Sequence, residues 1–579
     1  MYTKKISSLA IIFMSFLAIG QFDNDKLLTS NQTPTYEETI SFYKDLSDKT
    51  EGMRLFNMGD SDYGLPIYLC VLNYDPSNED SLSIFESARQ TTTLLINNAI
   101  HPGEPCGVNA SMKLALDFAE MSEAERKTFP LIGIIPAYNI GGMKNRGAHS
   151  RANQEGPELH GFRGNASNLD LNRDFVKMDS KNMFTFAKIF HSLDPDVFID
   201  THTSNGANYQ YTLTYITPIM EKLAPSIRSI FEEDMIPSLK RSVDKNWGYD
   251  LFPYVNLKGR TPKEGMVKFN ATPRYSMGYT DLFHTISFTT ETHMLKPFPD
   301  RVKSTYGFLI ETAKYSQENS KAIEKARVEA FEYDQQQREL PVNFKLDSIP
   351  ESIDFKEFEW TFEASEITTG KRLKYHEDQP SDMTIPYFLN YSPTDSVLIP
   401  DYFVVGRQAF DVIERLKANK VAFRMISKDT LVSLKKLKVV DYSTLERPYE
   451  GHFLHRTIQY ETIIDSVQLK RGDILIKTDQ SKRRFLAKLL SPEYVDSYFS
   501  WNFFDSYLQQ KEHFSSYVFE EIATKLLEDN TELKATYEKK LEQDSSFAES
   551  RYQQLNFIYR NSPHYEDHGV LPVYLSIDE

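Results

Sequence analysis

The sequence predicts an α/β fold, with a mixed, mostly parallel sheet flanked by helices and a second, α+β C-terminal domain. Three observations predict this fold. Short apolar, β-prone runs alternate with helical patterns through the first half of the chain, as expected for a sheet with helices on both faces. The 579 residues are too many for one compact core. The hydrophobic content of 40% and the charged content of 26% are those of an ordinary globular protein.

The helices and strands of the first half are predicted from the spacing of apolar residues and from the turn-forming residues between them. Residues 107–120, for example, carry Val108, Met112, Ala115 and Ala119 at helical spacing. Strands are expected at residues 65–74, 91–96, 131–136, 197–200 and 285–290, and helices at 35–49, 107–120, 184–190 and 312–338. Residues 139–170 are polar and rich in Gly and Asn, and a long segment of this kind inside a compact domain is usually functional.

The second half has a different pattern. Prolines punctuate its early part, which is expected to be irregular or β. A strand–helix–strand pattern follows at residues 402–405, 409–418 and 421–426. Residues 515–554 are charged and helical in character, and the aromatic run 498–504 is expected to be core. We therefore place a linker near residues 335–340. It separates a first domain at 30–338 from a C-terminal α/β accessory region of unknown role at 339–579.

The N-terminus has the pattern of a secretory signal. Lys4 and Lys5 precede the apolar run 9–19, which small or turn-prone residues, Ala18 and Gly20, close. The run is shorter than the roughly 20 residues that span a membrane. We expect a signal peptide at 1–20, export to the periplasm or the extracellular space, and no stable membrane insertion.

The net charge and the number of cysteines exclude further classes of protein. The formal net charge of −16 argues against a nucleic-acid partner, which would require a basic surface. Cys70 and Cys106 could be joined in an exported protein, but two cysteines in so long a chain do not form a disulfide framework. They are expected to be small buried side chains.

Metal-binding residue types stand where predicted strands end. His101-Pro102-Gly103-Glu104 follows the strand at 91–96, and His202 follows the strand at 197–200. Ligand sites of open α/β sheets lie at such strand ends. Imidazole nitrogen and carboxylate oxygen suit Zn²⁺, and three protein ligands leave the fourth position open for water, as catalytic sites require. Asp200 is a candidate to hold the outer nitrogen of a ligand.

A hydrolytic zinc site also needs a base and a stabiliser of negative charge. Glu291, at the end of the strand 285–290, is the candidate base. The polar loop offers guanidinium groups that suit an oxyanion or a substrate carboxylate. His293 follows Glu291 by two residues and would share its face if the strand continued. A direct role of His293 in the site is a minor alternative.

Together these motifs resemble the carboxypeptidase A-like zinc metallopeptidases. The motifs occur in the order of that family: His101-x-x-Glu104, Arg163-x-Asn165, Leu171-Asn172-Arg173-x-Phe175, Asp200-Thr201-His202 and Glu291. The resemblance covers roughly residues 30–320, and the spacing from Arg163 to Asn172 is closer to bacterial-type members. It implies that the first domain is a zinc carboxypeptidase-like catalytic domain.

The resemblance implies roles for these residues. His101, Glu104 and His202 would hold one Zn²⁺ per chain, and Glu291 would be the general base. Arg163 would polarise the scissile carbonyl, with Arg146 and Arg151 as fallback choices. Asn172 and Arg173 would bind the terminal carboxylate of the substrate. Members often have a tyrosine that caps the substrate, and Tyr275 and Tyr279 both compete for that role.

The implied activity is that of an exported metallocarboxypeptidase, which hydrolyses the C-terminal peptide bond of a peptide substrate with zinc-activated water. One alternative keeps the zinc chemistry but acts as an amidase, endopeptidase or deacylase on cell-wall stem peptides or N-acyl groups. Another alternative is an inactive binding protein with the same fold. The presence of all three ligands, the base and the arginines argues against it.

Overall fold

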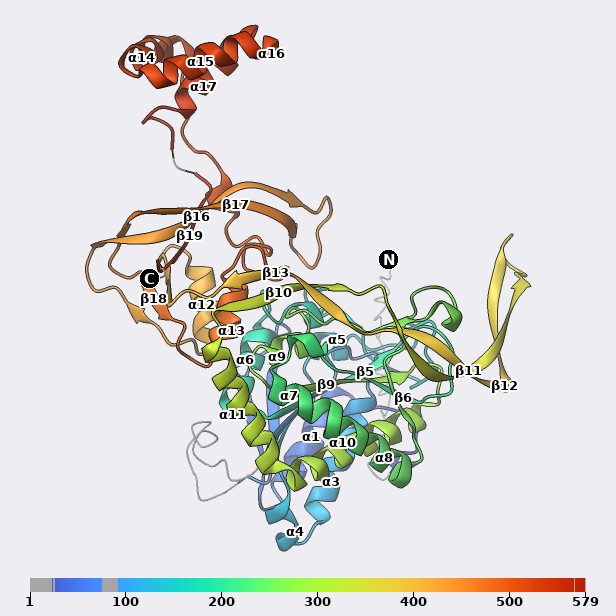
Figure 1. The fold of residues 1–579 in the computed structure, drawn as a ribbon. Coiled ribbons are helices and arrows are strands. Elements are labelled where there is room, and N and C mark those ends of the chain that lie inside the picture. Colours follow the sequence, from blue (N-terminus) through green and yellow to red (C-terminus); the bar gives the residue numbers. More distant parts are fainter. Residues whose placement is uncertain (1–22, 24–25, 75–91, 567, 578–579) are drawn as a thin grey trace, which may run out of the picture.

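The computed structural model describes residue 23 and residues 26–74, 92–566 and 568–577 (Figure 1). The signal peptide predicted at 1–20 lies outside these residues, as does the first residue of the strand predicted at 91–96. Within the described residues, no helix combines the length and the apolar character needed to cross a bilayer.

An eight-stranded mixed sheet forms the centre of the first domain, in the order β1-β2-β4-β3-β5-β9-β6-β7. The central strands β4, β3, β5 and β9 are parallel, whereas β1, β2 and β6 run antiparallel to a neighbour. The strands are β1 (Met53–Asp60), β2 (Pro66–Leu72), β3 (Thr93–Asn97), β4 (Leu131–Ile135), β5 (Val197–Ser204), β6 (Leu213–Ile216), β7 (Leu251–Pro253) and β9 (Ile286–His293). The parallel strands are buried along nearly their whole length, which explains why they read as continuous apolar runs. The predicted mixed, mostly parallel sheet is confirmed.

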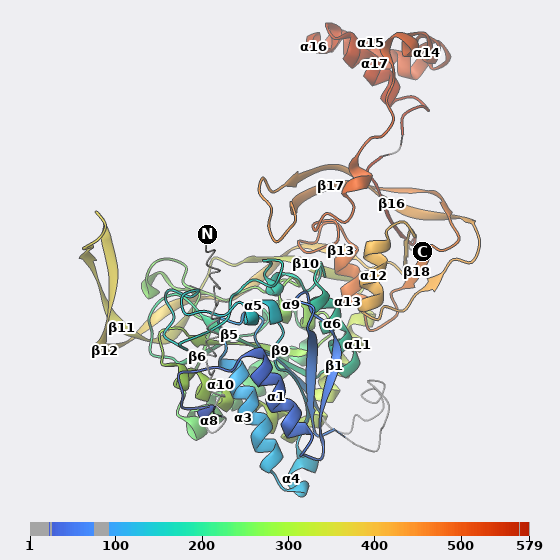
Figure 2. The same cartoon turned by 180° about the vertical axis from the view of Figure 1, so that it is seen from behind.

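Helices cover both faces of this sheet (Figures 1 and 2). One layer contains α1 (Tyr36–Ser47), α3 (Cys106–Glu120), α8 (Ile236–Trp247) and α10 (Phe298–Glu318). The other layer contains α6 (Lys181–Leu193) and α9 (Ser276–Asp281). Shorter segments are α4 (Glu123–Thr128), α5 (Ile140–Lys144), α7 (Pro225–Ser229) and the 3-10 turn η2 (Leu171–Arg173).

The prediction of a single helix at 312–338 is wrong, because the structure has two helices in this segment. α10 ends at Glu318 and α11 (Ser320–Gln336) begins after Asn319, which leaves the helical conformation at φ −110° and ψ 18°. The Asn319 side chain donates to the Tyr315 carbonyl at 2.9 Å. Asparagine competes with backbone hydrogen bonding in this way, so it ends one helix and begins the next.

The C-terminal region begins with long hairpins. β10 (Glu339–Leu346) pairs with β13 (Tyr391–Leu398), and β11 (Glu351–Ala364) pairs with β12 (Lys371–Phe388). The end of β12 also pairs with β8 (Met266–Val267) of the first domain. The β11–β12 hairpin projects away from the body of the molecule (Figure 1).

A second sheet of six strands follows, in the order β15-β18-β14-β19-β16-β17. Its strands are β14 (Tyr402–Val405), β15 (Arg424–Met425), β16 (Thr430–Thr444), β17 (His455–Leu469), β18 (Ile474–Lys477) and β19 (Val570–Leu575). The helices are α12 (Phe410–Ala418), α13 (Arg483–Leu489), α14 (Ser516–Asp529), α15 (Thr531–Gln543), α16 (Ser545–Ala548) and α17 (Arg551–Arg560). The strand predicted at 421–426 is only the two-residue β15, an exposed edge with one neighbour.

The two halves share one hydrophobic core. Helix α12 packs on α6 and α13 packs on α11. Phe283 of the first domain stacks on Phe485 of α13 with ring centroids 5.6 Å apart. In the aromatic run 498–504, Tyr498 and Trp501 are buried in that same core, as predicted. The C-terminal region is therefore packed onto the face of the sheet that α6 and α9 cover.

Close packing of α3 against β5 gives a prediction about stability. A Cβ added at Gly107 would lie 2.0 Å from Thr201 Oγ1 and 2.5 Å from Asn98 Oδ1. We expect Gly107→Ala to lower the free energy of unfolding by about 1–3 kcal/mol, because overpacking forces backbone shifts. Gly147→Ala is the matched control, since nothing lies within 4 Å of an added Cβ there. Equal denaturation midpoints for the two variants would contradict this packing.

Candidate metal centre and substrate cavity

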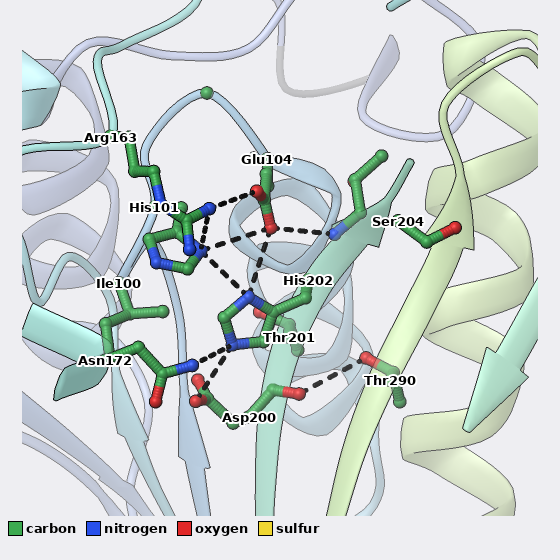
Figure 3. Close-up of polar contacts among 12 residues, drawn as sticks. Ile100, His101, Glu104, Arg163, Asn172, Asp200, Thr201, His202, Ser204 and Thr290 are labelled. Atoms are coloured by element: carbon green, nitrogen blue, oxygen red, sulfur yellow. Dashed lines mark hydrogen bonds and ion pairs between the residues drawn. The ribbon is translucent and has the colours of Figure 1, made fainter. Parts of the chain in front are cut away.

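The three predicted ligands lie together at the carboxyl end of the parallel strands (Figure 3). β3 pairs with β5 in a register that sets Asn97 opposite Asp200, so the turn after β3 lies beside His202. That turn carries His101 and Glu104. β5 extends to Ser204, so His202 lies within the strand rather than after it as predicted. The three side chains come from two segments far apart in the sequence, the turn after β3 and strand β5, and all are buried.

The donor atoms have the spacing of a metal site. His101 Nδ1 lies 3.1 Å from His202 Nδ1, which lies 3.1 Å from Glu104 Oε2. The third edge, from His101 Nδ1 to Glu104 Oε2, is 3.4 Å. A tetrahedral site with bonds of about 2.1 Å separates its ligand atoms by about 3.4 Å. The donor set therefore fits a small divalent cation.

Two carboxylates orient the imidazoles. Asp170 Oδ1 lies 2.9 Å from His101 Nε2, and Asp200 Oδ2 lies 3.0 Å from His202 Nε2. When each Nε2–H donates to its carboxylate, each Nδ1 presents a lone pair to the centre. Three acceptors then converge, and a cation satisfies all of them. Asp200 was predicted in this role, whereas Asp170 was missed although it stands two positions before Asn172.

Charges around the centre keep the carboxyl groups of Glu104 and Asp170 ionised. Burial alone would raise the pKa of Glu104, but Arg151 and His101 hold that pKa well below its usual range. Burial opposes ionisation of Asp170 as well, yet His101 and Arg163 lower its pKa. Both carboxylates are therefore ionised over the whole physiological pH range.

Two arginines of the polar loop border the donor set. Arg163 donates through Nε to Asp170 Oδ2 at 3.0 Å, and its Nη1 lies 3.5 Å from Glu104 Oε1. Arg151 donates through Nη1 to the same Glu104 oxygen at 2.6 Å. The fallback Arg146 donates instead to the backbone carbonyls of Thr33 and Pro34, so it is not brought to the site.

The candidate base lies on the next strand. β9 pairs in parallel with β5, and Glu291 is directly opposite His202. Its side chain borders the same cavity as the donor set. Burial, followed by the negative charge of Glu104, raises the pKa of Glu291 to about 8 against the opposing effect of His202. A carboxyl group tuned in this way can both accept and return a proton near neutral pH.

A cavity of about 490 Å³ adjoins the centre. One wall carries Asn172 and Arg173 on η2, and the Arg173 guanidinium lies 4.3 Å from the ring centre of Tyr275. Asn172 accepts a hydrogen bond from the Ser276 backbone at 3.0 Å, and its Nδ2 lies 3.4 Å from His202 Nε2. The apolar lining residues include Ile216, Phe269, Ala271 and Met277.

Other side chains considered from the sequence are engaged elsewhere. Tyr279 is fully buried and donates to Asn419 Oδ1 at 2.7 Å, so Tyr275 is the tyrosine of the pair that borders the cavity. His293 Nε2 lies 2.8 Å from the Ala207 carbonyl, outside the donor set. Cys70 and Cys106 are free and buried, as expected.

One contributor to the site comes from the C-terminal region. Arg173 donates through Nε to Tyr449 Oη at 3.0 Å, and the Asp170 N–H donates to Glu450 Oε2 at 2.8 Å. No motif around Tyr449 and Glu450 distinguishes them in the sequence, and only the folded chain brings them into contact with Arg173 and Asp170.

Comparisons with known proteins give structural matches only. No protein-family model matches the sequence, and a search of curated proteins gives no match. The structural likeness is to metallo-carboxypeptidases. The enzyme from Burkholderia cenocepacia is 14% identical with a TM-score of 0.34, over 51% of this chain and 70% of that chain. The Pseudomonas aeruginosa enzyme, solved with (2-guanidinoethylmercapto)succinic acid, is 13% identical with a TM-score of 0.36, over 49% and 69%. Carboxypeptidase A from Helicoverpa armigera is 14% identical with a TM-score of 0.37, over 53% and 80%.

The outer carboxylate generates a prediction about metal affinity. We expect Asp170→Asn to weaken Zn²⁺ binding by about 10- to 100-fold, because the amide no longer fixes the tautomer and orientation of His101. Competition with a chromophoric chelator measures the affinity. Asp48→Asn, at an exposed position after α1, is the control. Unchanged affinity in Asp170→Asn would contradict the assigned orientation of His101.

Proposed function

We propose that the chain is a zinc-dependent metallocarboxypeptidase that removes the C-terminal residue of peptides. The observation that carries the proposal is the arrangement of one cavity. A buried three-donor set and a carboxyl group of raised pKa lie at one side, and a guanidinium suited to a free carboxylate lies at another.

Zinc is the proposed ion, held by His101, Glu104 and His202. Two imidazole nitrogens and one carboxylate oxygen form the type of ligand set found in catalytic zinc sites. When bound, the ion would supply Lewis-acid polarisation of the scissile carbonyl and a water acidic enough to attack near neutral pH.

The protein side chains supply the proton transfer and the charge stabilisation. Glu291 takes a proton from the attacking water and delivers it to the leaving amine. Arg163 stabilises the negative charge that develops on the carbonyl oxygen. Arg151, which is held closely by Glu104, serves mainly to balance the charge of that ligand.

Substrate orientation follows from the other walls. Arg173 and Asn172 bind the terminal carboxylate, since a guanidinium pairs with a carboxylate in a defined geometry. Tyr275 stacks on Arg173 and closes this side of the bound peptide. The apolar wall formed by Ile216, Phe269 and Met277 favours an apolar or aromatic C-terminal side chain.

The predicted export signal is consistent with a peptide substrate outside the cytoplasm. The signal predicted at 1–20 would carry the enzyme to the periplasm or the extracellular space. In that compartment the alternative substrates are cell-wall stem peptides or N-acyl groups, which an amidase, endopeptidase or deacylase would cleave. The guanidinium at the cavity wall favours the carboxypeptidase.

Replacing the base separates chemistry from folding. We expect Glu291→Gln to lower kcat by about 10²- to 10⁴-fold, because an amide cannot relay the proton. Bound zinc and thermal stability should stay near those of the wild type. Glu357→Gln is the control, since it replaces another buried glutamate, on β11 and outside the cavity. Near wild-type turnover in Glu291→Gln would show that the base assignment is wrong.

Substrate discrimination tests the carboxylate site. The wild type should hydrolyse a blocked dipeptide ending in Phe much faster than its C-terminal amide. Arg173→Gln should remove most of this preference, with a loss in kcat/KM of roughly 10²-fold on the free acid, because the charged partner of the substrate carboxylate is lost. Arg228→Gln, at an exposed position on α7, is the control. Equal wild-type rates on acid and amide would favour the amidase or endopeptidase.

A further inference from the structure

The tip of one hairpin of the C-terminal region contacts Arg173, a residue that lines the substrate cavity. Strands β16 and β17 are joined by residues 445–454, where Tyr449 and His452 exchange backbone hydrogen bonds of 2.7 and 3.1 Å. Between them, Glu450 has φ 49° and Gly451 has φ 86°. Two left-handed residues in succession form the tight turn typical of hairpins. The turn holds Tyr449 and Glu450 in fixed directions at the tip.

Three contacts connect this tip to the segment that carries Asp170 and Arg173. Tyr449 Oη accepts from Arg173 Nε at 3.0 Å, and Glu450 Oε2 accepts from the backbone N–H of Asp170 at 2.8 Å. His452 Nε2 lies 2.8 Å from Asp179 Oδ2. Two of these contacts reach Arg173 and Asp170, which lie beside the metal centre. The third reaches Asp179, which follows them closely in the sequence.

The Tyr449 ring is itself held from behind. It stacks on Trp501 at an interplanar angle of 27°, with ring centroids 6.3 Å apart, and Trp501 is fully buried. The Arg274 guanidinium lies 5.0 Å from the Trp501 ring and 5.5 Å from the Tyr449 ring. Arg274 Nε donates to Asp496 Oδ1 at 2.8 Å. Packing and charge therefore fix the Tyr449 hydroxyl in place.

The contact determines how Arg173 can meet a substrate. Nε is taken by Tyr449, Nη1 donates to the Asn172 carbonyl at 2.8 Å, and Tyr275 covers one face of the guanidinium. Among the described residues, Nη2 has no protein hydrogen-bond partner, so both of its N–H groups are available to a carboxylate. A guanidinium fixed in this way loses little side-chain entropy when a substrate binds.

We propose that Tyr449 is a positioning residue of the active site, which holds Arg173 in the orientation that reads the substrate carboxylate. The C-terminal region is then a functional part of the enzyme, because it supports the arginine at the carboxylate end of the cavity. This inference rests on the proposed carboxypeptidase function.

The test compares Tyr449→Phe with the wild type in the full-length, zinc-loaded protein. Tyr442→Phe is the matched control, because it removes a hydroxyl from the same hairpin at an exposed site on β16. KM and kcat are measured on the blocked dipeptide ending in Phe, and kcat/KM on its amide. We expect KM for the acid to rise about 5- to 20-fold in Tyr449→Phe with kcat nearly unchanged, because a hydrogen bond to a charged group that aids binding is lost.

The ratio of acid to amide hydrolysis separates the outcomes. A fall in this ratio for Tyr449→Phe alone supports the positioning role. An equal loss on both substrates, or no change on either, overturns that role and leaves the carboxypeptidase proposal standing. If the wild type itself does not distinguish acid from amide, the proposed function fails and this inference fails with it.

Discussion

The parallel register of β3, β5 and β9 is the constraint on which the candidate site depends. It sets Asn97 opposite Asp200 and His202 opposite Glu291. Ligands from one turn, a ligand from the next strand and the candidate base from a third strand therefore meet at one edge of the sheet. A shift by one residue would turn His202 to the other face of the sheet. Because these strands are buried on both faces, core packing keeps the register fixed.

Charge balance follows from that convergence. Three acceptor atoms face one another within 3.4 Å, and carboxylates occupy the outer nitrogens of both imidazoles. Such a concentration of lone pairs and negative charge is costly in a protein interior unless cations offset it. Arg151 and Arg163 offset part of the charge, and a bound divalent ion would offset the rest. Arg163, one of these two side chains, is also the one proposed to stabilise negative charge on the substrate.

The sequence predicts the parts of this structure that local pattern determines. The buried central strands, α3 and the three donors are recognisable because apolar runs end in ligand-type residues. The early part of the second half reads as irregular or β, but the individual strands of the exposed β11–β12 and β16–β17 hairpins were not placed. Long strands that are largely exposed lack a continuous apolar pattern. Asp170 directly precedes the motif Leu171-Asn172-Arg173-x-Phe175 and could have been assigned from that position. Tyr449 could not, because its role depends on how the C-terminal region packs on α6 and α9.

The most direct test of this account is the metal content of the purified chain. After reloading with Zn²⁺ and exhaustive dialysis, elemental analysis should find about one zinc per wild-type chain, as three protein ligands predict. The variant His202→Ala, shown by circular dichroism to be folded, should retain almost none. A wild-type chain that holds no zinc, or a folded His202→Ala chain that holds as much as the wild type, would contradict the assigned centre.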